Sequence, residues 1–243
     1  MSQSSDLAYD ISVCVHCDEI ASEQATLWSE AGVGLRTLRR FPDGGLRSGM
    51  VTLPSGWKSP SQESPVTQQL AILSGVIAFG ETTLRANAFA VVPAGATLPA
   101  MQVIEPVTAI VILDEAPRAV PDKTREIVIV PDIFAIEPFT PVIDGQPLHG
   151  FERRVLWIDP DTGADTRMLR IPAGFRGSGA NWHPVNEEIF CLEGDIQPDA
   201  TRPMRAGSFL WNPARSIHGF EEVTHGGCVL LEWHDGAWDL IRA

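Results

Sequence analysis

The sequence predicts an all-β protein that contains two consecutive copies of one β unit. Three observations support this expectation. The chain consists mainly of short β-rich runs, turn residues separate these runs, and one long segment occurs twice. A chain of 243 residues is long enough for one large β domain or two smaller ones.

The β-rich runs recur at close spacing along the whole chain. Turn signals such as Pro42–Gly45 and Asp159–Gly163 separate them. A short helix is expected only at Ser22–Glu30. Many short strands and few helices are typical of sandwiches and barrels. The expected strands are Ser48–Leu53, Leu70–Leu73, Phe89–Val92, Thr108–Leu113, Glu126–Val130, Arg153–Ile158, Thr166–Ile171, Glu188–Leu192, Ser208–Trp211 and Cys228–Trp233.

The internal repeat indicates two domains. Residues 64–75 (SPVTQQLAILSG) align without a gap with residues 183–194 (HPVNEEIFCLEG), and similar segments flank both copies. The Pro-rich stretch Asp114–Gly150 joins or wraps the two copies. We therefore expect an N-terminal domain at residues 1–117 and a C-terminal domain at residues 118–243.

Composition excludes several classes of partner. The net charge is −13, and no Lys/Arg cluster interrupts this acidity, so binding to nucleic acid or to an anionic membrane surface is not expected. No signal peptide is expected, because the first 20 residues lack a basic start followed by an apolar core, and no apolar run approaches the ~18 residues of a membrane span. Four cysteines form no recognisable disulfide framework, which favours a reduced, cytoplasmic protein.

Several residues of the second copy resemble the two motifs of the cupin superfamily, whose members are double-stranded β-helix (jelly-roll) barrels. The resemblance rests on a set of glycine, proline, histidine and glutamate positions: Pro172, Gly174, His183, Glu187, Gly194, Gly207, Pro213, His218 and Gly219. The runs EEIFCLEG and AGSFLWNPARSIHGF are most similar to ChrR-type cupins, which occur in anti-sigma factors and in small metal-dependent dioxygenases. The resemblance implies two tandem cupin barrels, a bicupin, and a homodimer.

The resemblance also implies a metal site in the C-terminal barrel, with His183, Glu187 and His218 as ligands. Glu188 is the alternative carboxylate, but neighbouring strand residues point to opposite faces. Imidazole and carboxylate ligands with open positions suit one divalent ion of Fe, Mn, Ni or Zn. Asn181 stands where cupins usually have histidine. It is a weak fourth ligand, a residue at the rim of the site, or the mark of a decayed site.

The first copy provides an internal control for the metal prediction. Its equivalent positions are Gln62, Ser64, Gln68 and Leu98. Since Leu98 cannot bind a metal and the others are poor ligands, the N-terminal barrel is expected to be degenerate and metal-free.

Aromatic and basic residues near these motifs are candidates for a substrate pocket. Trp182, Phe190 and Trp211 could line an apolar pocket, although aromatic residues on strands also form barrel cores. Arg176 could hold a substrate carboxylate. His225 and His234 could supply a missing ligand or a general base, but each lies in or beside a polar turn, so surface positions are expected for both.

We therefore expect a metal-dependent cupin oxidoreductase, dioxygenase-like in its metal site, that acts on a small organic substrate. The alternatives are a non-catalytic sensor of a small molecule or metal and a structural bicupin with vestigial sites. Fold alone does not choose among them.

Overall fold

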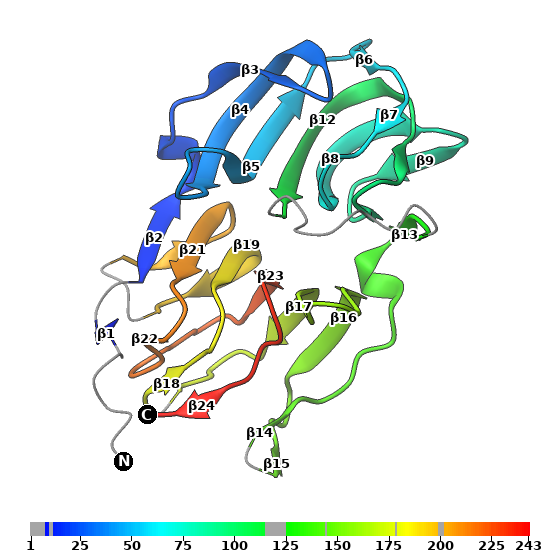
Figure 1. Cartoon of the computed structure of the whole chain (residues 1–243). Helices are drawn as coiled ribbons and strands as arrows, with labels where there is room; N and C mark the ends of the chain where they lie inside the picture. The colour runs from blue at the N-terminus through cyan, green and yellow to red at the C-terminus, as the bar shows by residue number, and fades with distance from the viewer. Residues whose placement is uncertain (1–7, 10–11, 115–124, 144, 178, 199–201) are drawn as a thin grey trace. The chain divides into compact units, whose positions relative to one another are not determined.

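The computed structural model describes residues 8–9, 12–114, 125–143, 145–177, 179–198 and 202–243, and β-strands are their dominant regular structure (Figure 1). The described residues contain no α-helix, only two short 3-10 turns. The all-β prediction is thus confirmed. No helix in the described ranges is long and apolar enough to cross a membrane.

The chain divides into two compact units. The N-terminal unit comprises Ile20–Ala135, and the C-terminal unit comprises Ile136–Ala243 together with Met1–Glu19. This division differs from the expected boundary between residues 117 and 118. The reason is strand pairing: β2 (Val13–His16) lies antiparallel to β21 (Ser208–Asn212) and covers its free edge.

The N-terminal unit has one main antiparallel sheet with the strand order β13-β10-β8-β12-β5-β4-β3. Its remaining strands form short pairs at the ends of these long ones. The bounds are β3 (Glu23–Leu27), β4 (Glu30–Arg40), β5 (Leu46–Leu53), β6 (Lys58–Ser59), β7 (Gln62–Glu63), β8 (Gln68–Phe79), β9 (Thr82–Arg85), β10 (Phe89–Val92), β11 (Thr97–Leu98), β12 (Met101–Leu113), β13 (Val128–Val130) and η2 (Ile133–Ala135).

The C-terminal unit repeats this topology with the order β16-β17-β23-β19-β21-β2. The other bounds are β1 (Ala8–Tyr9), η1 (Cys17–Glu19), β14 (Val142–Ile143), β15 (Gln146–Pro147), β16 (Glu152–Ile158), β17 (Asp165–Ile171), β18 (Asn181–Trp182), β19 (Glu187–Ile196), β20 (Met204–Arg205), β22 (Ser216–Ile217), β23 (Cys228–His234) and β24 (Ile241–Arg242).

The helix expected at Ser22–Glu30 is wrong. The segment forms β3 and the turn into β4, in which Trp28 and Ser29 have positive φ angles of 53° and 65°. Pairing of β3 with β4 satisfies the backbone groups that a helix would have satisfied internally, and tertiary context therefore overrides the weak helical pattern.

The sequence repeat is also a structural repeat. Gly75 and Gly194 both have positive φ, and a Cβ atom on either would overlap a backbone carbonyl oxygen, that of Pro106 or Gly227 respectively. Only glycine fits such a position. The bridge between Leu98 and Gln62 in the first copy corresponds to the bridge between His218 and Asn181 in the second.

Candidate metal centre

Three side chains from three segments meet inside the C-terminal unit. His183 follows β18, Glu187 begins β19, and His218 follows β22. All three are buried, with exposed fractions of 4%, 6% and 7%. The bridge between Asn181 and His218 brings the two histidine-bearing segments together, since the backbone N–H of each residue donates to the carbonyl oxygen of the other.

The ligand atoms of these residues form a triangle. His183 Nε2 and His218 Nε2 are 3.0 Å apart, and Glu187 Oε2 is 3.5 Å from the first and 3.8 Å from the second. Two donor atoms bound to one ion at ~2.1 Å, with an angle of 90–110°, stand roughly 3.0 to 3.5 Å apart. Two edges of the triangle lie in this range and the third, at 3.8 Å, is slightly longer, so the triangle is close to the size that a single divalent ion requires.

Hydrogen bonds fix the two imidazole rings in the orientation that a metal needs. Nδ1 of His183 donates to the carbonyl oxygen of Asp239 at 2.9 Å, and Nδ1 of His218 donates to that of Ser216 at 3.1 Å. A neutral ring with its hydrogen on Nδ1 would present the lone pair of Nε2 to the other two residues, which is the form that binds a metal. The donor set thus fits a metal ion.

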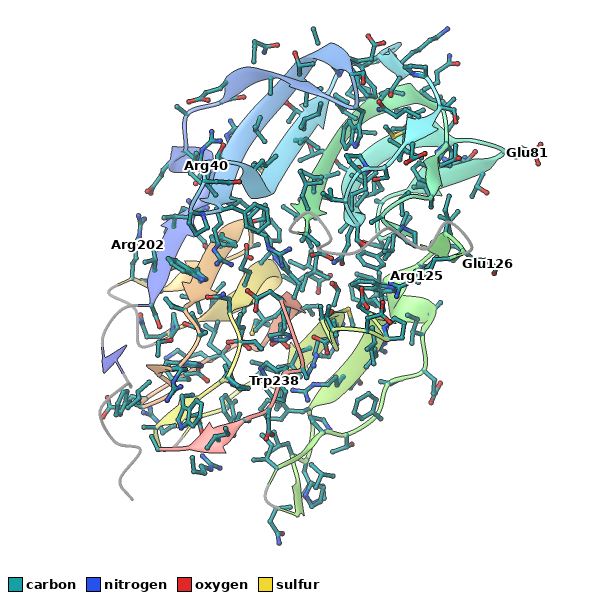
Figure 2. The ribbon with its side chains drawn as sticks, in the orientation of Figure 1. Arg40, Glu81, Arg125, Glu126, Arg202 and Trp238 are labelled. Carbon is teal, nitrogen blue, oxygen red and sulfur yellow. The ribbon has the colours of Figure 1, made fainter. Side chains whose placement is uncertain are left out.

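Glu187 is held at both of its oxygens. Oε1 accepts from His234 Nε2 at 3.1 Å and from Trp238 Nε1 at 3.2 Å, while Oε2 accepts from Asn212 Nδ2 at 2.8 Å. Because two donors occupy Oε1, Oε2 is the atom that faces the histidines. In Figure 2, Trp238 lies among the strands of the C-terminal unit.

Electrostatics keep Glu187 ionised. Burial alone would raise its pKa, but the charge of His183 and the hydrogen bonds from His183 and His234 lower the pKa well below its usual value. For His183, burial lowers the pKa and the carboxylate of Glu187 raises it, with a net increase. The site is thus an anion beside two imidazoles.

His234 links this triangle to a second carboxylate. Its Nδ1 lies 2.5 Å from Asp165 Oδ1, while its Nε2 faces Glu187. Burial lowers the pKa of His234, but the hydrogen bonds with Asp165 and Glu187 outweigh it and raise the pKa. Since both nitrogens face carboxylate oxygens, both donate, and His234 is an imidazolium that fixes the position of Glu187.

A cavity of about 240 Å³ opens from the triangle into the barrel. Its walls are mostly apolar, and its polar residues include Arg153, Arg176, Asn181 and Glu232. The apolar part comes from every second residue of the central strands, for example Leu169, Ile171, Ile189, Leu210 and Leu230. This combination of an apolar pocket and a few convergent polar groups is typical of a small-molecule site.

One of the four residues that we expected in a substrate pocket lines the cavity, and three do not. Arg176 lines the cavity, whereas Trp182, Phe190 and Trp211 are not in its lining. Phe190 is one residue beyond cavity-lining Ile189 and therefore lies on the opposite face of β19, opposite Phe209 of β21. Trp182 pairs with Ile241 of β24 instead.

The structure also shows where the two candidate glutamates and the remaining two candidate histidines lie. Glu187 faces the histidines, while Glu188, although buried, is outside the cavity lining, as the alternation of strand residues predicts. His225 is exposed, as expected. The surface position expected for His234 is wrong, since it is only 2% exposed at the end of β23.

Asn181 lies at the edge of the cavity. Its Oδ1 accepts from Arg242 Nη1 at 3.1 Å, and its Nδ2 is 3.4 Å from the carbonyl oxygen of Gly179. Both polar atoms thus have partners away from the histidine–glutamate triangle. This geometry favours a position of Asn181 at the rim of the metal site over a role as a weak fourth metal ligand.

Sequence reasoning missed Asp165, Asn212, Glu232 and Trp238. The strand period contained a signal for two of them: Asp165 shares the strand face of Leu169 and Ile171, and Glu232 shares that of Leu230. Trp238 lies in a loop after β23, where no periodicity could place it.

Comparisons with known proteins agree with this description. Residues 137–235 match the family model of the ChrR Cupin-like domain. A comparison with curated proteins found no match. Across the chain, the fold is that of solved bicupins, and the expected architecture of two tandem cupin barrels is confirmed.

Three solved structures illustrate the likeness. A Nostoc punctiforme protein described as a "putative dioxygenase" has a TM-score of 0.80 and 16% identity over 96% of this chain and 87% of its own. A Bacillus subtilis oxalate decarboxylase variant has a TM-score of 0.61 and 11% identity, covering 100% and 80%. Protein Ylba from E. coli has a TM-score of 0.65 and 13% identity, covering 94% and 92%.

Proposed function

We propose that this chain, a bicupin whose C-terminal half carries a ChrR cupin-like domain, is a metal-dependent enzyme that acts on a small organic substrate in its C-terminal barrel. The reaction class that we propose is oxygenation by one non-haem metal ion. One observation carries the proposal: the triangle of His183, Glu187 and His218 lies at the wall of a cavity inside the C-terminal unit.

The ligand set favours a catalytic over a structural metal. Structural zinc sites commonly have four protein ligands, whereas two histidines and one carboxylate leave coordination positions open. An ion held there would supply Lewis-acid chemistry and, for a redox-active metal such as iron, access to dioxygen chemistry. The likeness of the fold to a protein described as a "putative dioxygenase" supports this reaction class.

The other residues of the cavity have roles that do not depend on the metal's identity. His234, Trp238 and Asn212 hold the carboxylate of Glu187 in one orientation. The apolar walls exclude water and accept the hydrocarbon part of a substrate, which strengthens electrostatic interactions inside the cavity.

Metal loading followed by elemental analysis tests the proposal. Full-length protein is incubated anaerobically with Fe(II), Mn(II), Ni(II), Co(II) or Zn(II) and then dialysed. We expect retention of about one ion per chain and, with iron or manganese, oxygen uptake with one of a panel of small organic acids and enols. Retention of none of the five metals would refute the proposal.

A second candidate is a non-catalytic sensor, favoured by the ChrR cupin-like match over residues 137–235. A sensor would bind metal and a small molecule without turnover. The same oxygen-uptake assay, followed by product analysis, separates the two functions.

A further inference from the structure

We propose that Arg153 and Glu232 form a subsite for a short hydroxy acid in the C-terminal cavity, with the ligand carboxylate on Arg153 and its hydroxyl donating to Glu232. The inference deepens the proposed function, on which it rests for placing the substrate in this cavity. Neither residue belongs to the His183–Glu187–His218 triangle.

Glu232 is a buried carboxylate that faces the cavity. It lies on β23, is only 5% exposed, and lines the cavity wall. Among the described residues, no hydrogen-bond donor or cation contacts its carboxylate oxygens. A buried ionisable group without a partner is costly, and this cost is relieved when a ligand supplies a donor.

Arg153 is an unpaired cation at the same cavity. It lies on β16, its buried Nε has no hydrogen-bond partner among the described residues, and its guanidinium lies over the ring of Trp238 at 5.1 Å from the centroid. No described carboxylate lies within 4.0 Å of it. By contrast, Arg154 and Arg167 each pair with a carboxylate, those of Glu152 and Asp165.

Arg153 and Glu232 face one cavity without touching each other. Burial lowers the pKa of Arg153, and the negative charge of Glu232 is the next strongest influence, which opposes that decrease. They are therefore close enough to interact electrostatically but too far apart for an ion pair. A ligand with an anionic acceptor at one point and a hydroxyl donor at another would satisfy both.

The remainder of the cavity limits the ligand to a small, partly apolar molecule. Leu169, Ile189 and Leu230 contribute to its wall, and its volume of about 240 Å³ is below that of typical drug-sized sites. Arginine binds carboxylates in a bidentate manner, and this favours a carboxylate over a neutral acceptor at Arg153. A carboxylate, a nearby hydroxyl and a short branched alkyl chain together match these walls.

The test uses three matched probes on the full-length, zinc-loaded protein: 2-hydroxy-4-methylpentanoate, 4-methylpentanoate and 2-hydroxy-4-methylpentanamide. Calorimetry or ligand-observed NMR gives the affinities. We expect the hydroxy acid to bind most tightly, with about a tenfold loss on removal of either the hydroxyl or the negative charge. Equal binding of the acid and the amide would overturn the assignment of Arg153, and equal binding of the two acids would overturn that of Glu232.

Variants identify the residues that cause these preferences. R153Q is expected to weaken the hydroxy acid at least about tenfold and R153K to recover part of the loss. E232L is expected to abolish the preference for the hydroxyl, whereas E232Q keeps an acceptor oxygen and part of the preference. R170Q, which changes a half-exposed arginine of β17 outside the cavity lining, is the matched control and should bind as the unchanged protein does.

The same experiments separate this inference from the proposed function. Binding is repeated after chelation of the metal, and metal content is measured for every variant. If no metal is retained but the hydroxy acid still binds through Arg153, the enzyme proposal fails and the subsite stands. If binding disappears with the metal and R153Q has no effect, the ligand binds the ion, and the subsite is wrong.

Discussion

The two copies of the repeat share a backbone plan and differ in what fills their interiors. In the N-terminal unit, Trp28, Gln68 and Leu98 surround a void of only about 10 Å³, while the C-terminal unit contains the cavity of about 240 Å³. The strand orders correspond, and Gly75 and Gly194 occupy the same strained turn. The fold therefore tolerates both a filled and an open interior.

The polar residues of the two interiors show how one copy lost its site. Gln68, the counterpart of Glu187, donates from Nε2 to the hydroxyl of Ser64 at 2.5 Å and accepts from Trp28 Nε1 at 2.6 Å. These neutral groups satisfy one another without a cation. In the second copy, the corresponding positions bring a carboxylate and two imidazole Nε2 atoms to one point. A bound cation or added protons must balance the negative charge and the lone pairs of this arrangement.

The largest expected effect comes from removing the histidines of the second copy. The double variant His183→Ala/His218→Ala should lower retained metal from about one ion per chain to nearly none, since one carboxylate cannot hold an ion against dialysis. Elemental analysis measures this. The matched double variant Ser64→Ala/Leu98→Ala should leave metal content unchanged, and a loss there would contradict the assignment of the site to one copy.

The shared glycine turn should give equal effects in both copies. Gly75→Ala and Gly194→Ala should each lower the free energy of unfolding of their unit by more than about 2 kcal/mol, because left-handed strain of about 1–2 kcal/mol adds to a backbone overlap. Denaturant titration measures the change. Gly207→Ala, where φ is also positive but no atom lies within 4 Å of the added Cβ, should cost only the strain.

A smaller effect is expected from the residue that holds Glu187 in place. His234→Gln can bond to Glu187 or Asp165 but not to both, so it should weaken metal affinity about 10- to 100-fold without abolishing it. Competition with a chelating dye measures the affinity. Exposed His225→Gln is the control, and an equal loss in that variant would show that His234 has no specific role.

The smallest effect is expected at Asn181. Because its Oδ1 accepts a hydrogen bond from Arg242, Asn181→Ala should change metal affinity by less than about threefold. The dye competition assay applies again. A loss as large as that of a single histidine variant would make Asn181 a ligand, and a large gain in both metal and turnover with Asn181→His would indicate a site in decay.

The sequence predicts the architecture of this chain well because the relevant signals are local. Alternating strands, turn residues and the repeat identify an all-β fold in two copies, and the resemblance to the cupin motifs implies that the copies are cupin barrels. The resemblance to the cupin motifs implies that His183, Glu187 and His218 meet, and a barrel does return inward-facing residues of neighbouring strands to one point.

The sequence fails where position depends on contacts between distant segments. The roles of Trp238 and His234 could not be predicted, because they arise from packing against β16 and β17. Phe190 and Trp182 were misplaced because aromatic character does not indicate which face of a strand lines a cavity. The helix expected at Ser22–Glu30 failed because strand pairing outweighed its weak local pattern.

The pairing of β2 with β21 has a consequence for how the protein is made. During synthesis, Val13–His16 is complete long before Ser208–Asn212 exists, so a strand near the start of the chain must wait for one near its end. Closing a loop of this length is slow, and until then both strands have unpaired edges that favour aggregation. A tag or truncation near the N-terminus would therefore disturb maturation of the distant metal-bearing barrel while leaving the neighbouring barrel's sheet intact.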